Sequence, residues 1–202
     1  MVALFLHSLW QQLDSWDKQL FIKLNSAWTN PLFDAVLPYV RETVFWAPLY
    51  IFILAFIMFN YGKKGWQWSI AFLCTAAITD MVSTLLLKET VERLRPCQDP
   101  AFFMHVRLLL KHCTTINSYS FTSSDAANYF GLATFVSITF YPTFKRWIYL
   151  SYIWAIFISY AQVYVGVNYP LDVLGGAGIG VLAGLLTAWV FNKKSGTLIL
   201  DK

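Results

Sequence analysis

Three segments of this chain carry basic, hydroxyl, amide and carboxylate side chains at spacings suited to binding phosphate. They are Lys88–Pro96, Thr122–Asp125 and Ala161–Asp172. In the first, Lys88 and Arg95 are seven residues apart, which on a helix is two turns and the same face. Lysine offers a point charge, and arginine offers a planar fork for phosphate oxygens. We therefore predict that both bind one phosphate; the structural alternative is an ion pair between Lys88 and Glu92.

The second segment begins an apolar run with two serines and an aspartate. Serine caps a helix N-terminus, and the free amide groups there attract anions. Ser123 and Ser124 are therefore predicted phosphate ligands, with a plain helix cap as the alternative. Asp125 suits a first helical turn because its carboxylate complements the helix dipole. It donates a proton only if its surroundings keep it protonated near neutral pH.

The third segment holds Gln162, Asn168 and Asp172. Gln162 is a predicted phosphate ligand, because its amide can hydrogen-bond a phosphate oxygen without adding charge. Asn168-Tyr169-Pro170 is also typical of a turn that begins a helix, which is a structural reason for the asparagine.

Together the segments resemble the motifs of the type 2 phosphatidic acid phosphatase superfamily, Lys-x6-Arg-Pro, Pro-Ser-Gly/Ser-His and Ser-Arg-x5-His-x3-Asp. The spacing fits throughout, and the resemblance spans about Asp14 to Asn192. It implies an all-helical membrane bundle with a site at the outer boundary of the membrane it spans. It also implies lipid phosphates as substrates, such as phosphatidic acid, phosphatidylglycerol phosphate, undecaprenyl pyrophosphate or the lipid A 1-phosphate. We expect no cofactor, and the histidine spacing is not a metal motif.

The chain departs from these motifs at the positions of both family histidines. In the family, the histidine aligned with Asp125 protonates the leaving group. The histidine aligned with Asn168 attacks phosphorus and is oriented by the residue at Asp172. An amide nitrogen is delocalised into its carbonyl and has no basic lone pair for that attack. The remaining departures are Thr122, Ala161 and Gln162.

The departures predict a catalytically inactive member that binds a membrane lipid or forms part of a membrane protein complex. The alternative is an active lipid phosphatase with a rearranged site, and a third reading is an isoprenoid-lipid carrier. An imidazole would have to come from His105 or His112, folded over the site. Counting Lys88 and Arg95 against two aspartates gives a site of about zero charge, which predicts weak phosphate binding.

Composition predicts a membrane protein. Of 202 residues, 57% are hydrophobic and 13% are charged, about half the charge of a soluble domain. Apolar runs near the ~20 residues that cross a membrane are Val44–Tyr61, Trp66–Leu87, Ser123–Tyr141, Trp147–Val167 and Leu171–Asn192. We predict an all-α integral membrane bundle of about five transmembrane helices. The chain has a net charge of +4, but it shows no basic-aromatic patch that would indicate a nucleic-acid partner.

A single membrane domain over residues 1–202 is therefore expected. Residues 1–42 are predicted interfacial helices, because tryptophans mix there with charged residues at helical spacing; packing against the bundle is the alternative. Residues 43–192 are predicted to form the transmembrane bundle, with an outer loop at 88–122. Residues 193–202 are predicted to form a cytoplasmic tail. No charged n-region or cleavage site indicates a signal peptide.

Basic residues predict the orientation. The loops at Lys63-Lys64 and Lys145-Arg146, and the tail, hold lysine and arginine in excess, as cytoplasmic segments do. All three motifs then fall on the outer face, which the resemblance to bacterial relatives makes the periplasmic face of an inner membrane. Cys97 and Cys113 lie in the outer loop, where a disulfide can persist; two free thiols are the alternative.

Two further features lie within the apolar runs. Asp80 is an intramembrane carboxylate, which indicates either function or a hydrogen bond to a neighbouring helix. Gly176, Gly180 and Gly184 form a small-residue face that packs closely within the bundle or against another protein.

Overall fold

The computed structural model describes residues 2–113, 118–196 and 198, with residues 2–7 described by backbone alone. Residues 114–117 of the predicted outer loop, and 197 and 199–202 of the predicted tail, lie outside the described residues. The described chain is helical, which confirms the all-α prediction. Its long helices are α1 (Val2–Ile22), α2 (Pro31–Val40), α3 (Ala47–Met81), α5 (Ser124–Phe144), α6 (Leu150–Tyr164) and α7 (Pro170–Ser195). Shorter helical segments are η1 (Lys23–Ala27), η2 (Thr43–Trp46), η3 (Val82–Lys88), α4 (Glu89–Val91), η4 (Pro96–Gln98), η5 (Phe103–His105) and η6 (Lys145–Tyr149).

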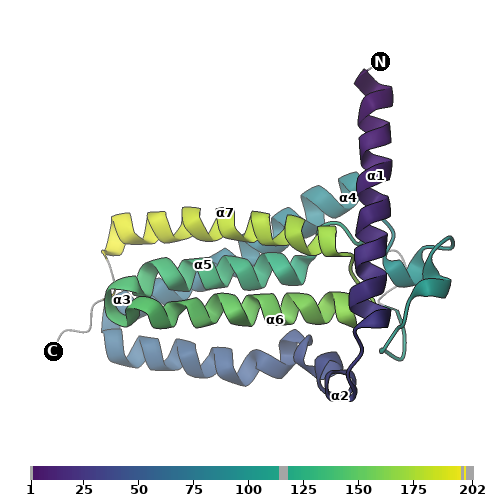
Figure 1. Cartoon of the computed structure of the whole chain (residues 1–202). Helices are drawn as coiled ribbons and strands as arrows, with labels where there is room; N and C mark the ends of the chain where they lie inside the picture. Colours follow the sequence, from purple (N-terminus) through teal and green to yellow (C-terminus); the bar gives the residue numbers. More distant parts are fainter. Residues whose placement is uncertain (1, 114–117, 197, 199–202) are drawn as a thin grey trace.

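Helices α3, α5, α6 and α7 lie side by side as a bundle (Figure 1). Helix α3 is a hairpin of two helical halves, because Gly62 takes a left-handed backbone with φ of 50°. A β-carbon at Gly65 would lie 2.3 Å from the carbonyl oxygen of Ile57, so the two halves meet closely there. The predicted apolar runs coincide with the two halves of α3 and with α5, α6 and α7.

By length and composition, two helical stretches of the described chain suffice to cross a membrane. They are Thr43–Gln98, which contains the α3 hairpin, and Pro170–Ser195. The number of crossings stays a prediction. Asp80, predicted as an intramembrane carboxylate, is exposed on the surface of α3, and its charge acts on Lys88. The described part of the chain shows no hydrogen bond from Asp80 to a neighbouring helix.

The glycine face of α7 packs against α5. A β-carbon at Gly176, Gly180 or Gly184 would come within 2.3–2.4 Å of a backbone carbonyl oxygen of α5 or its N-cap. These two backbones therefore approach more closely than any larger residue permits. Of the two alternatives for this face, the structure supports packing within the bundle.

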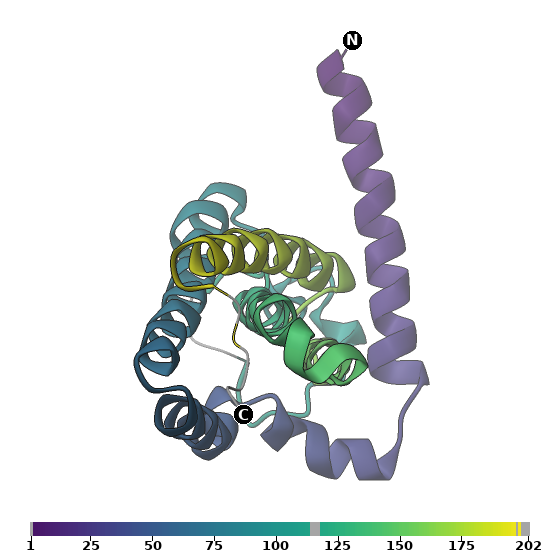
Figure 2. The ribbon, with the colours of Figure 1, turned by 90° about the vertical axis from the view of Figure 1, so that its left-hand side faces the viewer.

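The region predicted as interfacial helices begins with one long helix. Helix α1 runs unbroken to Ile22 and continues as η1. Figures 1 and 2 show α1 crossing one end of the bundle at a steep angle to α7. Helix α2 then begins at Pro31, after Asn30 has capped it by accepting a hydrogen bond from the Leu32 N–H at 2.8 Å.

The path of the chain brings the three motifs to one end of the bundle. Helix α5 begins, α6 ends and α7 begins at the end that α1 crosses (Figure 1). The segment that follows η3 reaches the same place, since the backbone N–H of Ser120 donates to the carbonyl of Arg93 at 2.7 Å.

Two alanine substitutions on α7 test this packing. Gly180→Ala places a methyl group 2.3 Å from the Ala127 carbonyl oxygen, whereas Gly178→Ala meets nothing within 4 Å. We expect Gly180→Ala to destabilise the protein by about 1–3 kcal/mol through overpacking. Gly178→Ala is expected to be neutral or slightly stabilising, because alanine is the better helix former. Thermal unfolding in detergent measures both, and equal melting temperatures would contradict the α5–α7 contact.

Candidate functional site

Lys88 and Arg95 reach the site by a different route from the predicted one. The helix that carries Lys88 ends at Val91, and Glu92 turns the chain with a left-handed φ of 50°. Arg95 then lies in extended backbone as the N-cap of η4. The two cations therefore do not share a helix face, although each still acts electrostatically on the other. Glu92 interacts with Tyr119, so the alternative pairing with Lys88 is wrong as well.

The Arg95 side chain is buried and fixed by neutral oxygens. Its Nε donates to the carbonyl and hydroxyl of Ser118 at 3.0 and 2.8 Å. Its Nη1 donates to the carbonyl of Val167 at 3.1 Å and approaches Asn168 Oδ1 at 3.5 Å. None of these partners carries a negative charge, so the guanidinium is held in position while its charge remains available to an anion.

The second motif forms the predicted helix start. Ser123 is the N-cap of α5, and its Oγ accepts from the Ala126 N–H at 3.3 Å. The Ser124 hydroxyl contacts the Ser83 hydroxyl on η3 at 3.1 Å. The predicted cap at Ser123 is thus confirmed, while a role for either serine in binding phosphate stays a prediction.

Two of the residues that differ from the family motifs contact each other. Gln162, buried near the end of α6, donates from Nε2 to Asp125 Oδ2 at 2.7 Å. The buried Gln162 Oε1 has no hydrogen-bond partner among the described residues. An amide and a carboxylate therefore form a bonded pair at the positions where the family places an arginine and a histidine.

Asn168 is buried and held at both ends of its amide. Its Nδ2 donates to the carbonyl of Ser120 at 3.1 Å, and its Oδ1 faces Arg95. The loop that carries it turns at Gly166, where a φ of 95° favours glycine. The side chain thus occupies a defined position beside the predicted phosphate-binding cation.

Asp172 is fully buried, and its carboxylate is occupied. Oδ1 accepts from Arg93 at 2.7 Å, and Oδ2 accepts from the backbone N–H of Tyr169 at 2.7 Å and from the Ser120 hydroxyl. In the family the equivalent carboxylate orients the imidazole. Here it is connected to Asn168 only through Ser120, and it caps α7.

Arg93 is a residue whose role the sequence did not reveal, although it lies inside the first motif. Its Nη2 donates to Asp14 and Asp17 of α1 at 2.8 and 2.7 Å, while its Nη1 binds Asp172. The guanidinium also lies over the Tyr169 ring, 4.1 Å from its centre, where a cation–π contact adds attraction. This cluster attaches α1 to the start of α7.

The two α1 carboxylates differ in their surroundings. Burial raises the pKa of Asp17 above its ordinary value despite the charge of Arg93. Burial acts in the same direction on Asp14, but hydrogen bonds from Lys18 and Arg93 outweigh it and lower the pKa of that carboxyl. Arg93 therefore pairs with Asp17 in a buried environment and with Asp14 in a partly solvated one.

Arg41 also belongs to the site and was not predicted. It follows α2, and among the charged groups around Asp125 its guanidinium acts most strongly, ahead of Lys88 and Arg95. The sequence count of zero charge therefore left out two features. It omitted Arg41, and it counted Asp172 as free although Arg93 pairs with it.

The segment predicted as the outer loop lies close to these groups. In the structure a disulfide joins Cys97 and Cys113, with their Cα atoms 5.9 Å apart. The His105 ring is exposed and lies 5.8 Å from the Phe102 ring, measured between centres, and His112 is exposed too. Neither histidine is buried against Asn168 in the way that an imidazole folded over the site would be.

A family model described as the PAP2 superfamily matches residues 68–195. Over 187 residues, the chain is 30% identical to a protein named lipid A 4'-phosphatase of Bacteroides thetaiotaomicron, covering 92% of this chain and 81% of that protein. It is also 27% identical to phosphatidylglycerophosphatase B of Bacillus subtilis over 85% of this chain and 80% of that one. The chain belongs to the PAP2 superfamily.

Solved structures agree with this assignment. The structure superposes on a transmembrane PAP2 type phosphatidylglycerolphosphate phosphatase from Bacillus subtilis with a TM-score of 0.70, at 25% identity and 96% coverage of both chains. It also superposes on Aquifex aeolicus LpxE with a TM-score of 0.59, at 26% identity, covering 84% of this chain and 92% of that one. The protein is thus a helical membrane protein whose relatives are named as lipid phosphatases.

The Arg93 cluster gives a stability prediction. Arg93→Met leaves Asp17 and Asp172 buried without their cation, and breaking such a pair costs about 3–5 kcal/mol. Lys18→Met is the matched control, because Lys18 and its partners Asp14 and Asp99 are 18–29% exposed and such pairs contribute at most about 1 kcal/mol. Unfolding in detergent should separate the two variants clearly. Equal, small losses would show that Arg93 does not hold α1 on the bundle.

Proposed function

We propose that this protein is a catalytically inactive PAP2 member that binds a lipid phosphate, by itself or as a subunit of a membrane complex. Asn168 carries the proposal. It occupies the position from which the family histidine attacks phosphorus, and its amide nitrogen has no basic lone pair. Its Nδ2 hydrogens face the Ser120 carbonyl, so the group acts there as a donor and not as a nucleophile.

The Asp125–Gln162 pair supports the same proposal. The family mechanism needs a proton donor at Asp125 and a cation at Gln162 to stabilise the transferred phosphoryl group. The observed pair offers a carboxylate that accepts from an amide. Three positions that the family uses for attack, protonation and charge stabilisation therefore hold groups that perform none of these in the family's way.

Retained cations support phosphate binding. Arg41, Lys88 and Arg95 act together on Asp125, and among the described residues Arg95 donates hydrogen bonds to neutral oxygens alone. The one carboxylate of Asp125 does not balance three cations, and like charges repel strongly where water is scarce. A phosphate group is the ligand that this arrangement suits.

An apolar groove below the site supports a lipid as the bearer of that phosphate. One pocket of about 580 Å³ lies between the two halves of α3 and the α5–α6 pair, and on α5 its lining begins at Tyr129. Tyr129 is one helical turn after Asp125, so the two residues share a face of α5. A chain that enters here therefore starts directly beneath the polar site.

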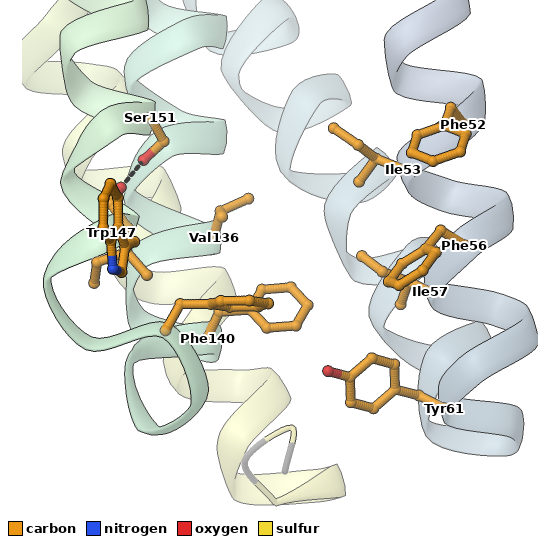
Figure 3. A pocket seen from close by; sticks show the side chains of 11 residues that line it. Phe52, Ile53, Phe56, Ile57, Tyr61, Val136, Phe140, Trp147 and Ser151 are labelled. Carbon is orange, nitrogen blue, oxygen red and sulfur yellow. Dashed lines mark hydrogen bonds between the residues drawn. The ribbon is translucent and has the colours of Figure 1, made fainter. Parts of the chain in front are cut away.

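The groove continues away from the site into a second pocket of about 300 Å³. Figure 3 shows Phe52, Phe56 and Tyr61 of α3 on one side, facing Val136 and Phe140 of α5 across the gap. The exposure of Phe52, at 65%, fits a wall that faces lipid. A single acyl or prenyl chain suits this narrow apolar space.

The names of the relatives favour a second candidate, an active lipid phosphatase with a rearranged site. Proteins named lipid A 4'-phosphatase and phosphatidylglycerophosphatase B share most of their length with this chain. An aspartyl nucleophile would be the chemical route, since carboxylates form phospho-intermediates in other enzymes. Asp125 is the candidate, because the Asp172 carboxylate is occupied by Arg93, Ser120 and Tyr169.

Phosphate release separates the two candidates. Purified protein is offered lipid A, phosphatidylglycerophosphate, phosphatidic acid and undecaprenyl pyrophosphate, and released phosphate is measured. We expect no release above that of a heat-denatured sample, because the site has no nucleophile of the family's kind. Release that disappears in Asp125→Ala would defeat the inactive reading and support the rearranged site.

A restored site is the positive control. The triple variant Asp125→His, Gln162→Arg and Asn168→His returns the family's three groups to a scaffold that has kept Lys88, Arg95 and Asp172. We expect it to release phosphate from at least one of these lipids, at least about tenfold above the parent. A folded triple variant without release would show that the other departures also disable the site.

We further propose that the site faces the periplasm of a bacterial inner membrane. The basic loops at Lys63-Lys64 and Lys145-Arg146 support this orientation. If it is correct, Cys97 and Cys113 lie in an oxidising compartment and form their disulfide in cells. The test alkylates free thiols in intact cells expressing Cys74→Ala, followed by mass spectrometry without reduction. Alkylation of both cysteines would contradict the orientation.

The same bond gives a stability prediction. A disulfide that closes a loop of about 15 residues contributes about 3 kcal/mol, and the two cysteines here are 16 apart. Cys97→Ser with Cys113→Ser should therefore unfold at a lower temperature than the parent. The difference should vanish when the parent is reduced first.

A further inference from the structure

Arg41 is a largely buried cation, and part of its guanidinium has no hydrogen-bond partner among the described residues. Its side chain is 12% exposed, and its Nη2 lies 3.2 Å from Glu42 Oε1. Its Nε and Nη1 are buried and have no hydrogen-bond partner among the described residues. Buried donors are almost always paired, because an unpaired one costs about 1–3 kcal/mol. A guanidinium with two such donors is therefore built to receive a ligand.

The position of Arg41 indicates which ligand. Its neighbour Val40 belongs to the same buried cluster as Tyr129 of α5, one helical turn after Asp125. The charge of Arg41 acts on Asp125 and on Arg95, so the guanidinium lies near both groups. Glu42 is its one charged partner in the described residues, and the Glu42 side chain is 54% exposed, where water screens it. Nε and Nη1 lie on different edges of the guanidinium, with the Glu42-bonded Nη2 between them, so one of the two can donate to an anion inside the site.

We propose that Arg41 is a phosphate ligand that lies outside the three motifs and that one of its unpaired donors, Nε or Nη1, donates to an oxygen of a phosphate group held between Arg41, Lys88 and Arg95. This rests on the proposed function, in which a lipid phosphate occupies the site. Arg41 would add a cation where Gln162 has none. The phosphate is that of a membrane lipid or free inorganic phosphate, which the experiment distinguishes.

Binding is measured in a maltoside detergent by calorimetry and by thermal shift, with dodecyl phosphate and with inorganic phosphate as the two probes. Arg41→Gln removes the charge and keeps much of the length. We expect it to weaken dodecyl phosphate binding by about 10- to 100-fold, the value of a hydrogen bond between charged groups. Arg41→Lys keeps the charge without the planar guanidinium and should fall between the two. Binding of the wild type should also depend more steeply on salt than that of Arg41→Gln.

Two further variants provide the controls. Arg95→Gln removes a cation of the first motif and should weaken binding as well. Arg146→Gln removes an exposed arginine on η6, at the other end of α6 from Gln162, and should bind like the wild type. Arg41→Gln should unfold near the wild-type temperature without ligand, because Arg41 has no buried carboxylate bonded to it.

The outcomes separate the two proposals. If Arg41→Gln binds as tightly as the wild type while Arg95→Gln does not, the role of Arg41 is refuted and the proposed function stands. If the wild type binds neither probe, the proposed function fails and the role of Arg41 fails with it. If inorganic phosphate binds as tightly as dodecyl phosphate, Arg41 is a phosphate ligand but the groove does not hold the chain. Should Arg41→Gln fail to fold, the loss in Arg41→Lys decides, and wild-type affinity there would refute the hydrogen bond from the Arg41 guanidinium.

Discussion

The rest of the structure depends on the guanidinium of Arg93, which joins three parts of the chain that lie far apart in sequence. It binds Asp14 and Asp17 near the N-terminus and Asp172 at the start of α7. A buried cation without these partners would be very costly, and so would the carboxylates without the cation. The pairing therefore requires α1 to lie across the end of the bundle. It also holds the third motif against the first.

This arrangement changes what Asp172 can do. In the family its equivalent orients a catalytic imidazole, but here both of its oxygens are occupied by Arg93, Ser120 and the Tyr169 amide. A carboxylate with that role stabilises the fold whether or not chemistry takes place nearby. The survival of Asp172 beside Asn168 therefore has a structural explanation, and it is not by itself a sign of activity.

The site combines lost chemistry with retained charge. Gln162 donates from Nε2 to Asp125, and Asn168 donates from Nδ2 to the Ser120 carbonyl, so each of these departures is hydrogen-bonded within the site. The cations Arg41, Lys88 and Arg95 remain, and a groove lined by apolar side chains begins one turn below them. Binding a lipid phosphate requires the cations and the groove, whereas hydrolysis by the family's route requires the imidazoles as well.

The sequence by itself determined the helical membrane class, the approximate runs of the bundle helices, the three motifs and the meeting of those motifs at one end. These follow from composition, from apolar runs of a set length and from local spacing, which are properties of neighbouring residues. It also led to the pairing of Cys97 with Cys113, since both lie in one loop. Local spacing wrongly predicted that Lys88 and Arg95 share one helix face. The helix that carries Lys88 ends at Val91, and nothing in the pattern showed that Glu92 would take a left-handed conformation.

Only the tertiary structure decided which distant charges meet. Asp17 and Arg41 lie in the region predicted as interfacial helices, and Arg93 lies within the first motif, so local pattern gave none of them its partners. Their partners are fixed by how α1 and α2 fold back on the bundle. The exposure of Asp80 and the packing of the α7 glycines against α5 were likewise beyond local pattern. Each depends on which face of a helix meets another, and the energy of that choice is shared among residues far apart in the chain.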